Sequence, residues 1–150
     1  MKEHVGGKRG RIMTDANAQS VAWAIAKGSA DQGAEIAFTN QGEALKKRVG
    51  PLAESVGADI LLPCDVTDEA SMDATFAEIE AKWGKLDCLV HAIGFSDKSE
   101  LRGRYVDTTA KNVEMTMHIS VYSFTAVAQR AEKLMDKGGS MVTLTYYGSE

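Results

Sequence analysis

The chain has 150 residues, of which 44% are hydrophobic and 25% charged, and its formal net charge at pH 7 is −4. These values are typical of a single globular domain with an ordinary core. The negative charge gives no reason to expect nucleic acid or an anionic membrane surface as a partner.

Neither a secretory signal nor a membrane span is expected. Residues 1–8 lack the apolar stretch of a signal peptide, and no apolar run approaches the ~20 residues that cross a bilayer. The two cysteines, Cys64 and Cys88, fall in apolar runs and are too few for a disulfide framework. We expect both to be reduced and buried in a cytoplasmic protein.

Short apolar runs alternate with amphipathic stretches along the whole chain, which is the pattern of β-α-β units around a parallel sheet. Five strands are predicted, at residues 10–13, 35–39, 59–63, 86–91 and 140–145. Right-handed crossovers between them predict a doubly wound, Rossmann-like α/β sheet with the strand order 3-2-1-4-5. We expect residues 1–150 to form one dinucleotide-binding domain that is C-terminally incomplete, with its sheet truncated after the fifth strand.

The helices between these strands are predicted from a 3.6-residue apolar period. The period is carried in the second helix by Leu45, Val49, Leu52 and Val56, and in the third by Met72, Phe76, Ile79 and Trp83. Thr67 is the predicted N-cap of the third helix. Four glycines are predicted to end helices just before strands: Gly33, Gly57, Gly84 and Gly138.

A long fourth helix is predicted over residues 109–137. One apolar stripe is expected to cover the sheet: Val113, Met117, Val121, Phe124, Ala128, Ala131 and Met135. A second apolar set lies on another face: Met115, Ile119, Tyr122 and Ala126. Two apolar faces need two partners, so this helix either lies deep in its own core or forms a subunit interface.

Ligands of such sheets bind beyond the carboxyl ends of the strands, at the switch point between strands 1 and 4. The turn after the first strand offers Ser20 at a helix start but contains no glycine, so it suits either a pyrophosphate site or an ordinary loop. Gln41, after the second strand, is neutral and can hydrogen-bond a ribose hydroxyl. Asp65, after the third strand, can accept a hydrogen bond from an adenine amine or help to cap the next helix.

The segment that leaves the fourth strand contains small residues and Gly94, which allow a ribose to pass close to the backbone. His91 lies inside the apolar strand, so we predict a core histidine satisfied by backbone groups rather than an acid or base. His4 and His118 have no second ligand at metal-binding spacing, so no metal site is expected.

Five stretches together resemble the bacterial enoyl-acyl-carrier-protein reductases, NADH-dependent members of a divergent arm of the short-chain dehydrogenase/reductase superfamily. They are SVAWAIA at 20–26, GAEIAFT at 33–39, CDV at 64–66, HAIGF at 91–95 and LTYYG at 144–148. The resemblance runs from about Gly7 to Glu150. It implies reduction of a trans-2-enoyl thioester on acyl carrier protein in fatty-acid biosynthesis: hydride from NADH reaches the β-carbon, and the resulting enolate is protonated. It also implies a homo-oligomer, a tetramer in the family.

The resemblance assigns roles to individual residues. The implied cofactor contacts are Ser20 and Val21 for the pyrophosphate, Gln41 for the adenine ribose, Asp65 and Val66 for the adenine, and Ile93 and Gly94 for the nicotinamide side. Phe95 and Ser96 are expected to line the acyl pocket. Tyr146 corresponds to the first of two tyrosines in the family's site, close to the thioester. The second tyrosine, and a lysine about seven residues beyond it, would follow Glu150. The 150-residue chain alone is therefore expected to lack reductase activity.

Two residues depart from the family pattern, which has a glycine at Thr14 and an apolar residue at Asp15. A carboxylate within ~5 Å of a pyrophosphate oxygen repels it by roughly 3 kcal/mol at an effective dielectric near 20. This exceeds the ~1 kcal/mol that a helix dipole supplies. We therefore expect weak NADH binding, which the double change Thr14→Gly with Asp15→Val would tighten at least ~10-fold.

Two other functions stay open. A carbonyl-reducing short-chain dehydrogenase usually carries Asn-Ala-Gly after the fourth strand, where this chain has residues 91–94 as His-Ala-Ile-Gly. A non-catalytic binding or scaffold protein of the same fold is favoured by Thr14, Asp15 and the length of the chain. A truncated sheet would also expose an apolar edge, and hence favour self-association, through Met141, Val142, Leu144 and Tyr146.

Overall fold

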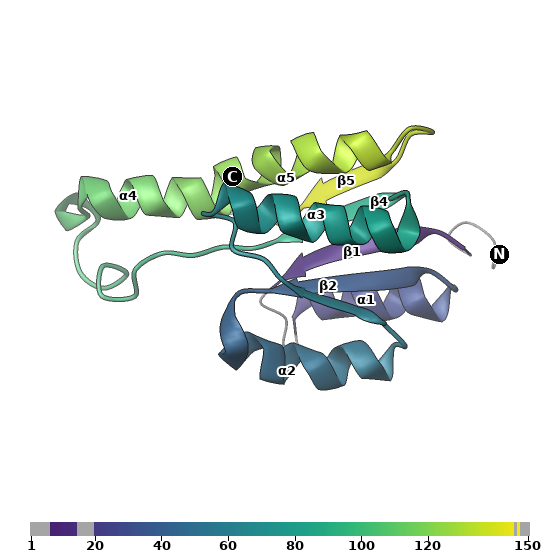
Figure 1. The fold of residues 1–150 in the computed structure, drawn as a ribbon. Helices are drawn as coiled ribbons and strands as arrows, with labels where there is room; N and C mark the ends of the chain where they lie inside the picture. Colours follow the sequence, from purple (N-terminus) through teal and green to yellow (C-terminus); the bar gives the residue numbers. More distant parts are fainter. Residues whose placement is uncertain (1–6, 15–19, 146, 148–150) are drawn as a thin grey trace.

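The computed structural model describes residues 7–14, 20–145 and 147, and for residues 10–14 and 43–45 it describes the backbone alone. Strands and helices alternate (Figure 1). The strands are β1 (Arg9–Thr14), β2 (Glu35–Asn40), β3 (Ile60–Pro63), β4 (Cys88–Ala92) and β5 (Ser140–Thr143). The helices are α1 (Val21–Asp31), α2 (Gly42–Ser55), α3 (Glu69–Trp83), α4 (Ala110–Met117) and α5 (Ser123–Ala131). None of these helices combines the length and the apolar character needed to cross a membrane.

All five described strands are parallel and lie in the order β3-β2-β1-β4-β5. β1 is central, because Gly10 pairs with Ile36 on one side and with Cys88 on the other. The chain therefore leaves β1 toward one edge of the sheet and later returns to its other side. This reversal creates the switch point between β1 and β4, where the loops diverge.

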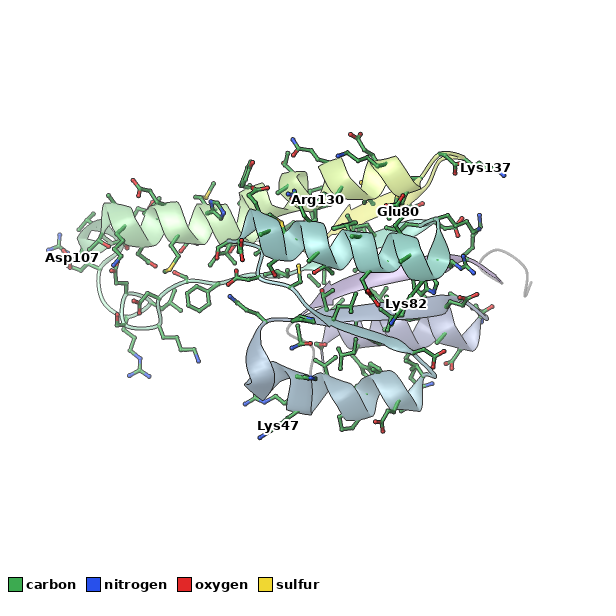
Figure 2. The ribbon with its side chains drawn as sticks, in the orientation of Figure 1. Lys47, Glu80, Lys82, Asp107, Arg130 and Lys137 are labelled. Atoms are coloured by element: carbon green, nitrogen blue, oxygen red, sulfur yellow. The ribbon has the colours of Figure 1, made fainter. Side chains whose placement is uncertain are left out.

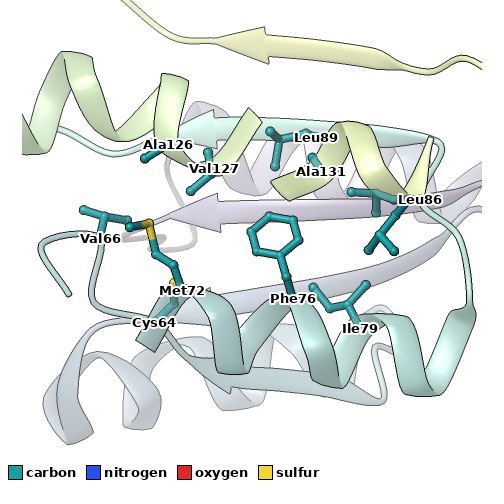
Figure 3. Packing of buried hydrophobic residues seen from close by; sticks show 11 residues of the cluster. Cys64, Val66, Met72, Phe76, Ile79, Leu86, Leu89, Ala126, Val127 and Ala131 are labelled. Carbon is teal, nitrogen blue, oxygen red and sulfur yellow. The ribbon is translucent and has the colours of Figure 1, made fainter. Parts of the chain in front are cut away.

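Two hydrophobic layers hold helices on both faces of the sheet. On one face, α1 and α2 pack through Ala22, Ala26 and Val49 against Phe38 of β2. On the other face lie α3 and α5 (Figure 1). Figure 3 shows that second layer, in which α3 side chains meet α5 and the sheet: Met72, Phe76, Ile79, Leu89, Val127 and Ala131. The apolar period predicted for the third helix is therefore its buried face.

The strand boundaries differ slightly from the prediction. β4 begins at Cys88 rather than at residue 86, because the amide of Leu86 donates to Leu134 and that of Asp87 to Arg9, outside the regular ladder. β5 ends at Thr143 rather than at residue 145.

The N-cap of α3 is Asp68, not Thr67. The Asp68 carboxylate accepts a hydrogen bond from the amide of Ala70 at 3.0 Å. Thr67 instead donates its amide and its hydroxyl to Asp65, at 2.8 and 2.7 Å. At the other end of α3, Gly84 has φ 66°, a left-handed conformation in which glycine carries no Cβ penalty.

The predicted fourth helix is one helical run from Ala110 to Leu134, but its apolar stripe is only half correct. A π-helical segment, His118–Tyr122, separates α4 from α5. The extra residue of a π turn rotates the faces on its two sides relative to each other. Ala131 is buried as expected, whereas Val113, Met117 and Val121 are about half exposed. The core side of the run is formed by Ile119, Ser123, Ala126, Val127, Ala131 and Leu134.

Candidate functional site

Two hollows adjoin at the carboxyl ends of the strands and share Ile93 and Gly94. The first reaches toward β2 and β3 and is lined by Thr39, Asn40, Gln41, Cys64, Val66, Phe95 and Ile119 as well. The second, of about 410 Å³, reaches toward the start of α1 and is completed by Val21, Ala92, Leu144 and Thr145. Residues from six separate segments thus meet around Gly94 at the switch point.

Ser20 and Val21 form the start of α1. The Ser20 hydroxyl caps the helix by accepting a hydrogen bond from the amide of Trp23 at 3.2 Å. Val21, the first helical residue, is largely exposed and lines the second hollow. Because the first amides of a helix point outward with partial positive charge, this end of α1 favours an anionic group.

The end of β2 is fixed by Asn40, whose side-chain amide donates to the carbonyl of Gly42 at 2.9 Å. Gly42 has φ 78°, so the turn into α2 uses a conformation that other residues rarely adopt. This turn exposes Gln41, whose Nε2 donates to Oδ2 of Asp65 at 2.9 Å. The predicted ribose residue and the predicted adenine residue are therefore direct neighbours.

Asp65 carries a charge held by several donors. Partial burial alone would raise its pKa, but hydrogen bonds from the hydroxyl and amide of Thr67 and from Gln41 outweigh this effect and lower the pKa below its ordinary value of 3.8. The carboxylate is ionised at neutral pH and remains partly accessible. Its contacts with Thr67 shape the turn just before α3, so Asp65 also has the local structural role left open by the sequence.

Beyond β4 the chain passes through Ile93 and Gly94 into the exposed Phe95. A Cβ atom added at Gly94 would meet only the hydroxyl of Ser120, at 4.0 Å, so the space around this residue is open. Ser120 holds the following residue: its hydroxyl accepts from the Phe95 amide at 3.0 Å and lies 3.2 Å from the Phe95 carbonyl. The protein thus keeps a gap at Gly94 while fixing the backbone next to it.

Ser96 lines a different hollow, of about 350 Å³, between the loop after β4 and helix α4. Its hydroxyl lies 3.1 Å from that of Thr116 and 3.3 Å from the side-chain amide of Asn112, a buried residue. The structure therefore does not bring Ser96 into the two hollows around Gly94.

His91 is buried, as predicted, but the prediction that backbone groups satisfy its ring is wrong. Nδ1 lies 2.9 Å from the hydroxyl of Thr143, and Nε2 lies 2.7 Å from that of Ser123. Burial lowers the pKa of His91 from its ordinary value of 6.5, although a backbone hydrogen bond opposes this shift. The neutral ring is therefore a structural link between β4, β5 and α5.

Some predicted residues cannot be placed. Tyr146 and Asp15 lie outside the described residues, and of Thr14 only the backbone is described, paired with Ala92. Cys64 is buried and Cys88 half-buried, and the two do not form a disulfide with each other. Among the described residues, no group of three or more His, Cys, Asp or Glu side chains is arranged to hold a metal ion.

The site also contains residues that the sequence did not single out. Asn40 was within reach of such reasoning, because it directly follows an apolar strand at the correct edge of the sheet. Ser120 and Ile119 gave no such signal, since they come from a helix more than twenty residues beyond Gly94 and their place depends on the π-helical segment.

Comparisons with known proteins agree with this fold. A sequence model of the family described as Enoyl-(Acyl carrier protein) reductase matches residues 16–150. The enoyl-[acyl-carrier-protein] reductase [NADH] 1 of Rhizobium meliloti is 62% identical over 97% of this chain. The enoyl-[acyl-carrier-protein] reductase [NADH] FabI of Rickettsia bellii is 51% identical over 96%. The chain spans 54% and 55% of these two relatives, about half of their length.

Solved structures give the same result. The enoyl-(acyl-carrier-protein) reductase of Anaplasma phagocytophilum, solved in complex with NAD, is 54% identical with a TM-score of 0.93. The match covers 97% of this chain and 56% of that one. The Bacillus cereus reductase, solved with NADP⁺, is 36% identical with a TM-score of 0.88 and is covered over 57% of its length.

The strand order and the similar solved structures together define a Rossmann-like α/β domain of the short-chain dehydrogenase/reductase type. The chain belongs to the enoyl-acyl-carrier-protein reductase family.

Proposed function

We propose that this chain is the cofactor-binding part of an NADH-dependent reductase that converts trans-2-enoyl thioesters of acyl carrier protein in fatty-acid biosynthesis. One observation supports the proposal: Val21, Gln41 and Val66 line the two hollows that share Ile93 and Gly94 at the switch point of the sheet. A relative with 54% identity has been solved in complex with NAD.

The residues present fit a dinucleotide that lies across the switch point. The start of α1, with Ser20 and Val21, suits a pyrophosphate because its amides carry partial positive charge. On the β2 side, Gln41 and Asp65 offer an amide and a carboxylate for hydroxyl and amino groups, and Val66 supplies an apolar wall. At the other end, Gly94 leaves room for a ring close to the backbone, and Ile93 packs beside it.

The nicotinamide cofactor supplies the hydride in this reaction. The chain's own residues position the two reactants: Phe95, which lines the first hollow and is exposed, borders the expected entrance for the enoyl chain. The hydrogen bonds between Ser120 and the Phe95 backbone keep that border in place. Tyr146 is proposed to stand close to the thioester, and Ser96 to stabilise the loop through Asn112 rather than to contact the acyl chain.

The same proposal includes assembly and location. The half-exposed face formed by Val113, Met117 and Val121 is a candidate surface for a homo-oligomer. Cys64 and Cys88 are not joined in a disulfide, which is the usual state of cysteines in a reducing compartment such as the cytoplasm.

Calorimetric titration of the chain with NADH, and in parallel with NADPH, tests the proposal. Gly94→Val places a branched side chain where the two hollows join, and we expect it to weaken NADH binding at least ~10-fold, or about 1.4 kcal/mol. The matched control is Gly28→Val, in an open position on α1. Equal NADH affinity of wild type and Gly94→Val, or no binding of either nucleotide, would contradict the assignment of this site.

A further inference from the structure

Residues 94–97, which we call the exit segment of β4, have no regular secondary structure. Figure 1 shows the chain running from β4 along α4 toward the far end of the molecule, where Figure 2 labels Asp107. None of the four residues is buried, and Phe95 is 48% exposed. Burial of apolar side chains therefore does not hold the exit segment, although it begins at the Gly94 that both cofactor hollows share.

Ser120 holds the start of the exit segment by hydrogen bonds. Its hydroxyl accepts from the amide of Phe95 at 3.0 Å and donates to the carbonyl of the same residue at 3.2 Å. One side chain thus satisfies both polar backbone groups of Phe95. Ser120 lies in the π-helical segment, next to the Ile119 that lines the first hollow. A rotation of the Phe95 backbone would break both bonds, so the position of the adjoining Gly94 depends on Ser120.

Asn112 and Thr116 hold the rest of the exit segment. Asn112 is only 5% exposed, and its Oδ1 accepts from the amide of Asp97 at 3.0 Å. Its Nδ2 donates to the hydroxyl of Ser96 at 3.3 Å. The hydroxyl of Thr116 lies 3.1 Å from that of Ser96. Helix side chains thus provide contacts for each residue from Phe95 to Asp97.

These three helix residues, which we call the polar ladder, are spaced four apart and so share one face of the helical run. The same face continues to Ser123, which is bonded to His91 inside β4. The helical run and the chain leaving β4 are therefore antiparallel and matched pair by pair: Ser123 with His91, Ser120 with Phe95, Thr116 with Ser96, and Asn112 with Asp97.

The other side of the ladder offers no packing that could replace these bonds. Ser96, Asn112 and Thr116 border the hollow of about 350 Å³ between the loop and α4. The exit segment thus has open space on that side and exposed side chains outward. Its place relative to the sheet depends on the ladder.

We propose that the polar ladder positions the nicotinamide end of the dinucleotide by fixing the backbone that leaves Gly94. The inference rests on the proposed function, since that function places the nicotinamide beside Gly94. Asn112, Thr116 and Ser120 act through the exit segment, so they are positioning residues and need not touch the cofactor. The pyrophosphate and adenine ends lie toward α1 and β2, away from the ladder, so their binding should not depend on it.

Calorimetric titration of the chain with NADH and with ADP-ribose, which lacks the nicotinamide ring, tests this role. The test variants are Ser120→Ala and Asn112→Ala, and Ser120→Thr is the conservative variant that keeps the hydroxyl. The matched control is Thr125→Ala, which removes a hydroxyl from an exposed position of the same helical run. Urea unfolding of each variant gives the folded fraction by which the affinities are corrected.

We expect Ser120→Ala to weaken NADH binding at least ~5-fold and ADP-ribose binding less than twofold, because a lost hydrogen bond is worth about that much. Asn112→Ala should show the same preference for ADP-ribose. Ser120→Thr and Thr125→Ala should bind both ligands within about twofold of wild type. The nicotinamide fluorescence of bound NADH should shift toward that of free NADH in Ser120→Ala and stay as in wild type in Ser120→Thr. A purely structural role of Ser120 would move neither the ratio of the two affinities nor this emission.

An equal loss of NADH and ADP-ribose affinity in Ser120→Ala, or an unchanged NADH affinity, would overturn the positioning role and leave the proposed function standing. If wild type binds neither ligand, both proposals fail. If Asn112→Ala does not fold, Ser120→Ala decides alone, because it removes a single hydroxyl from a half-buried position.

Discussion

The Nε2 atom of His91 lies 2.7 Å from the hydroxyl of Ser123, in the layer between β4 and α5. Ser123 donates its only hydroxyl hydrogen to the carbonyl of Ile119, at 2.6 Å. Nε2 must therefore carry the hydrogen in this bond. Burial favours the neutral ring, and in that form Nδ1 accepts from the hydroxyl of Thr143, at 2.9 Å.

This arrangement predicts a loss of stability at mildly acidic pH. Because burial lowers the pKa of His91 in the folded state, the unfolded chain takes up the proton first as the pH falls below 6.5. The free energy of unfolding should be independent of this group above pH 6.5 and fall below it, by at most about 1.4 kcal/mol per pH unit until the lowered pKa is reached. Urea unfolding at several pH values measures the slope.

His91→Gln should reduce that slope while lowering stability at pH 7.5 by about 1–3 kcal/mol, since buried hydroxyl groups lose their partner. The exposed His118 gives the control, His118→Gln, which should leave the slope unchanged. If His91→Gln and wild type lose stability in parallel below pH 6.5, another group is responsible for the pH dependence.

A second prediction concerns Gly139, just before β5. A Cβ atom there would lie 2.6 Å from the Met135 sulfur and 2.9 Å from the backbone carbonyl of Asp87. That carbonyl accepts from the amide of Ser140 at 3.0 Å, so it cannot move without weakening the start of β5. Gly139→Ala should lower the free energy of unfolding by about 1–3 kcal/mol, measured by urea titration.

Gly28→Ala is the matched comparison, because Gly28 lies within α1 and a Cβ there meets no atom within 4 Å. Alanine is the better helix former, so this change should raise stability by about 1 kcal/mol. Equal effects of the two substitutions would mean that the packing around Gly139 is looser than described.

Much of the fold could be predicted because its signals are local. The period of Met72, Phe76 and Ile79 identifies the buried side of α3 from that segment alone. Parallel strands with right-handed crossovers then restrict the sheet to few topologies. The edge at which Gln41, Asp65 and Gly94 lie follows from the same rule, since each of them comes within two residues of the end of a strand.

The errors arise where the outcome depends on distant residues. The partners of His91 are 32 and 52 residues away, so no local pattern reveals them. The π-helical segment His118–Tyr122 rotates α4 relative to α5, and an apolar period that continues through it cannot show which half faces the core. Thr67 and Asp68 are both good N-caps, and the contacts of Thr67 with Asp65 decide between them.

The rotated helix leads to a third prediction. Val113, Met117 and Val121 form a half-exposed apolar face, and burial of such a face between two subunits is favourable. Sedimentation at about 100 µM should show wild type self-associated and Met117→Glu with Val121→Glu monomeric, because association depends on concentration. The control is Thr125→Glu, an exposed position of α5. Wild type that sediments as a monomer at this concentration would exclude the interface.

The last prediction concerns the pair formed by Gln41 and Asp65, whose side chains are joined at 2.9 Å. Gln41→Ala removes one hydrogen bond and should weaken NADH binding by about 1 kcal/mol, or roughly fivefold. Asp65→Asn keeps the shape of the side chain but removes its charge and replaces the oxygen that accepts from Gln41 by an NH₂ group, which cannot accept from an adenine amine, so it should weaken binding further. The hydrogen bonds lower the pKa of Asp65 below 3.8, so its carboxylate stays charged between pH 5 and 8. NADH affinity should therefore not change with pH through ionisation of Asp65 in that range.

Calorimetry on Gln41→Ala, Asp65→Asn and the double variant measures the coupling between the two residues, which we expect to be about 0.5–1 kcal/mol. Losses that add without coupling would show that Gln41 and Asp65 act on the cofactor independently, and an unchanged affinity of Asp65→Asn would remove Asp65 from the adenine site.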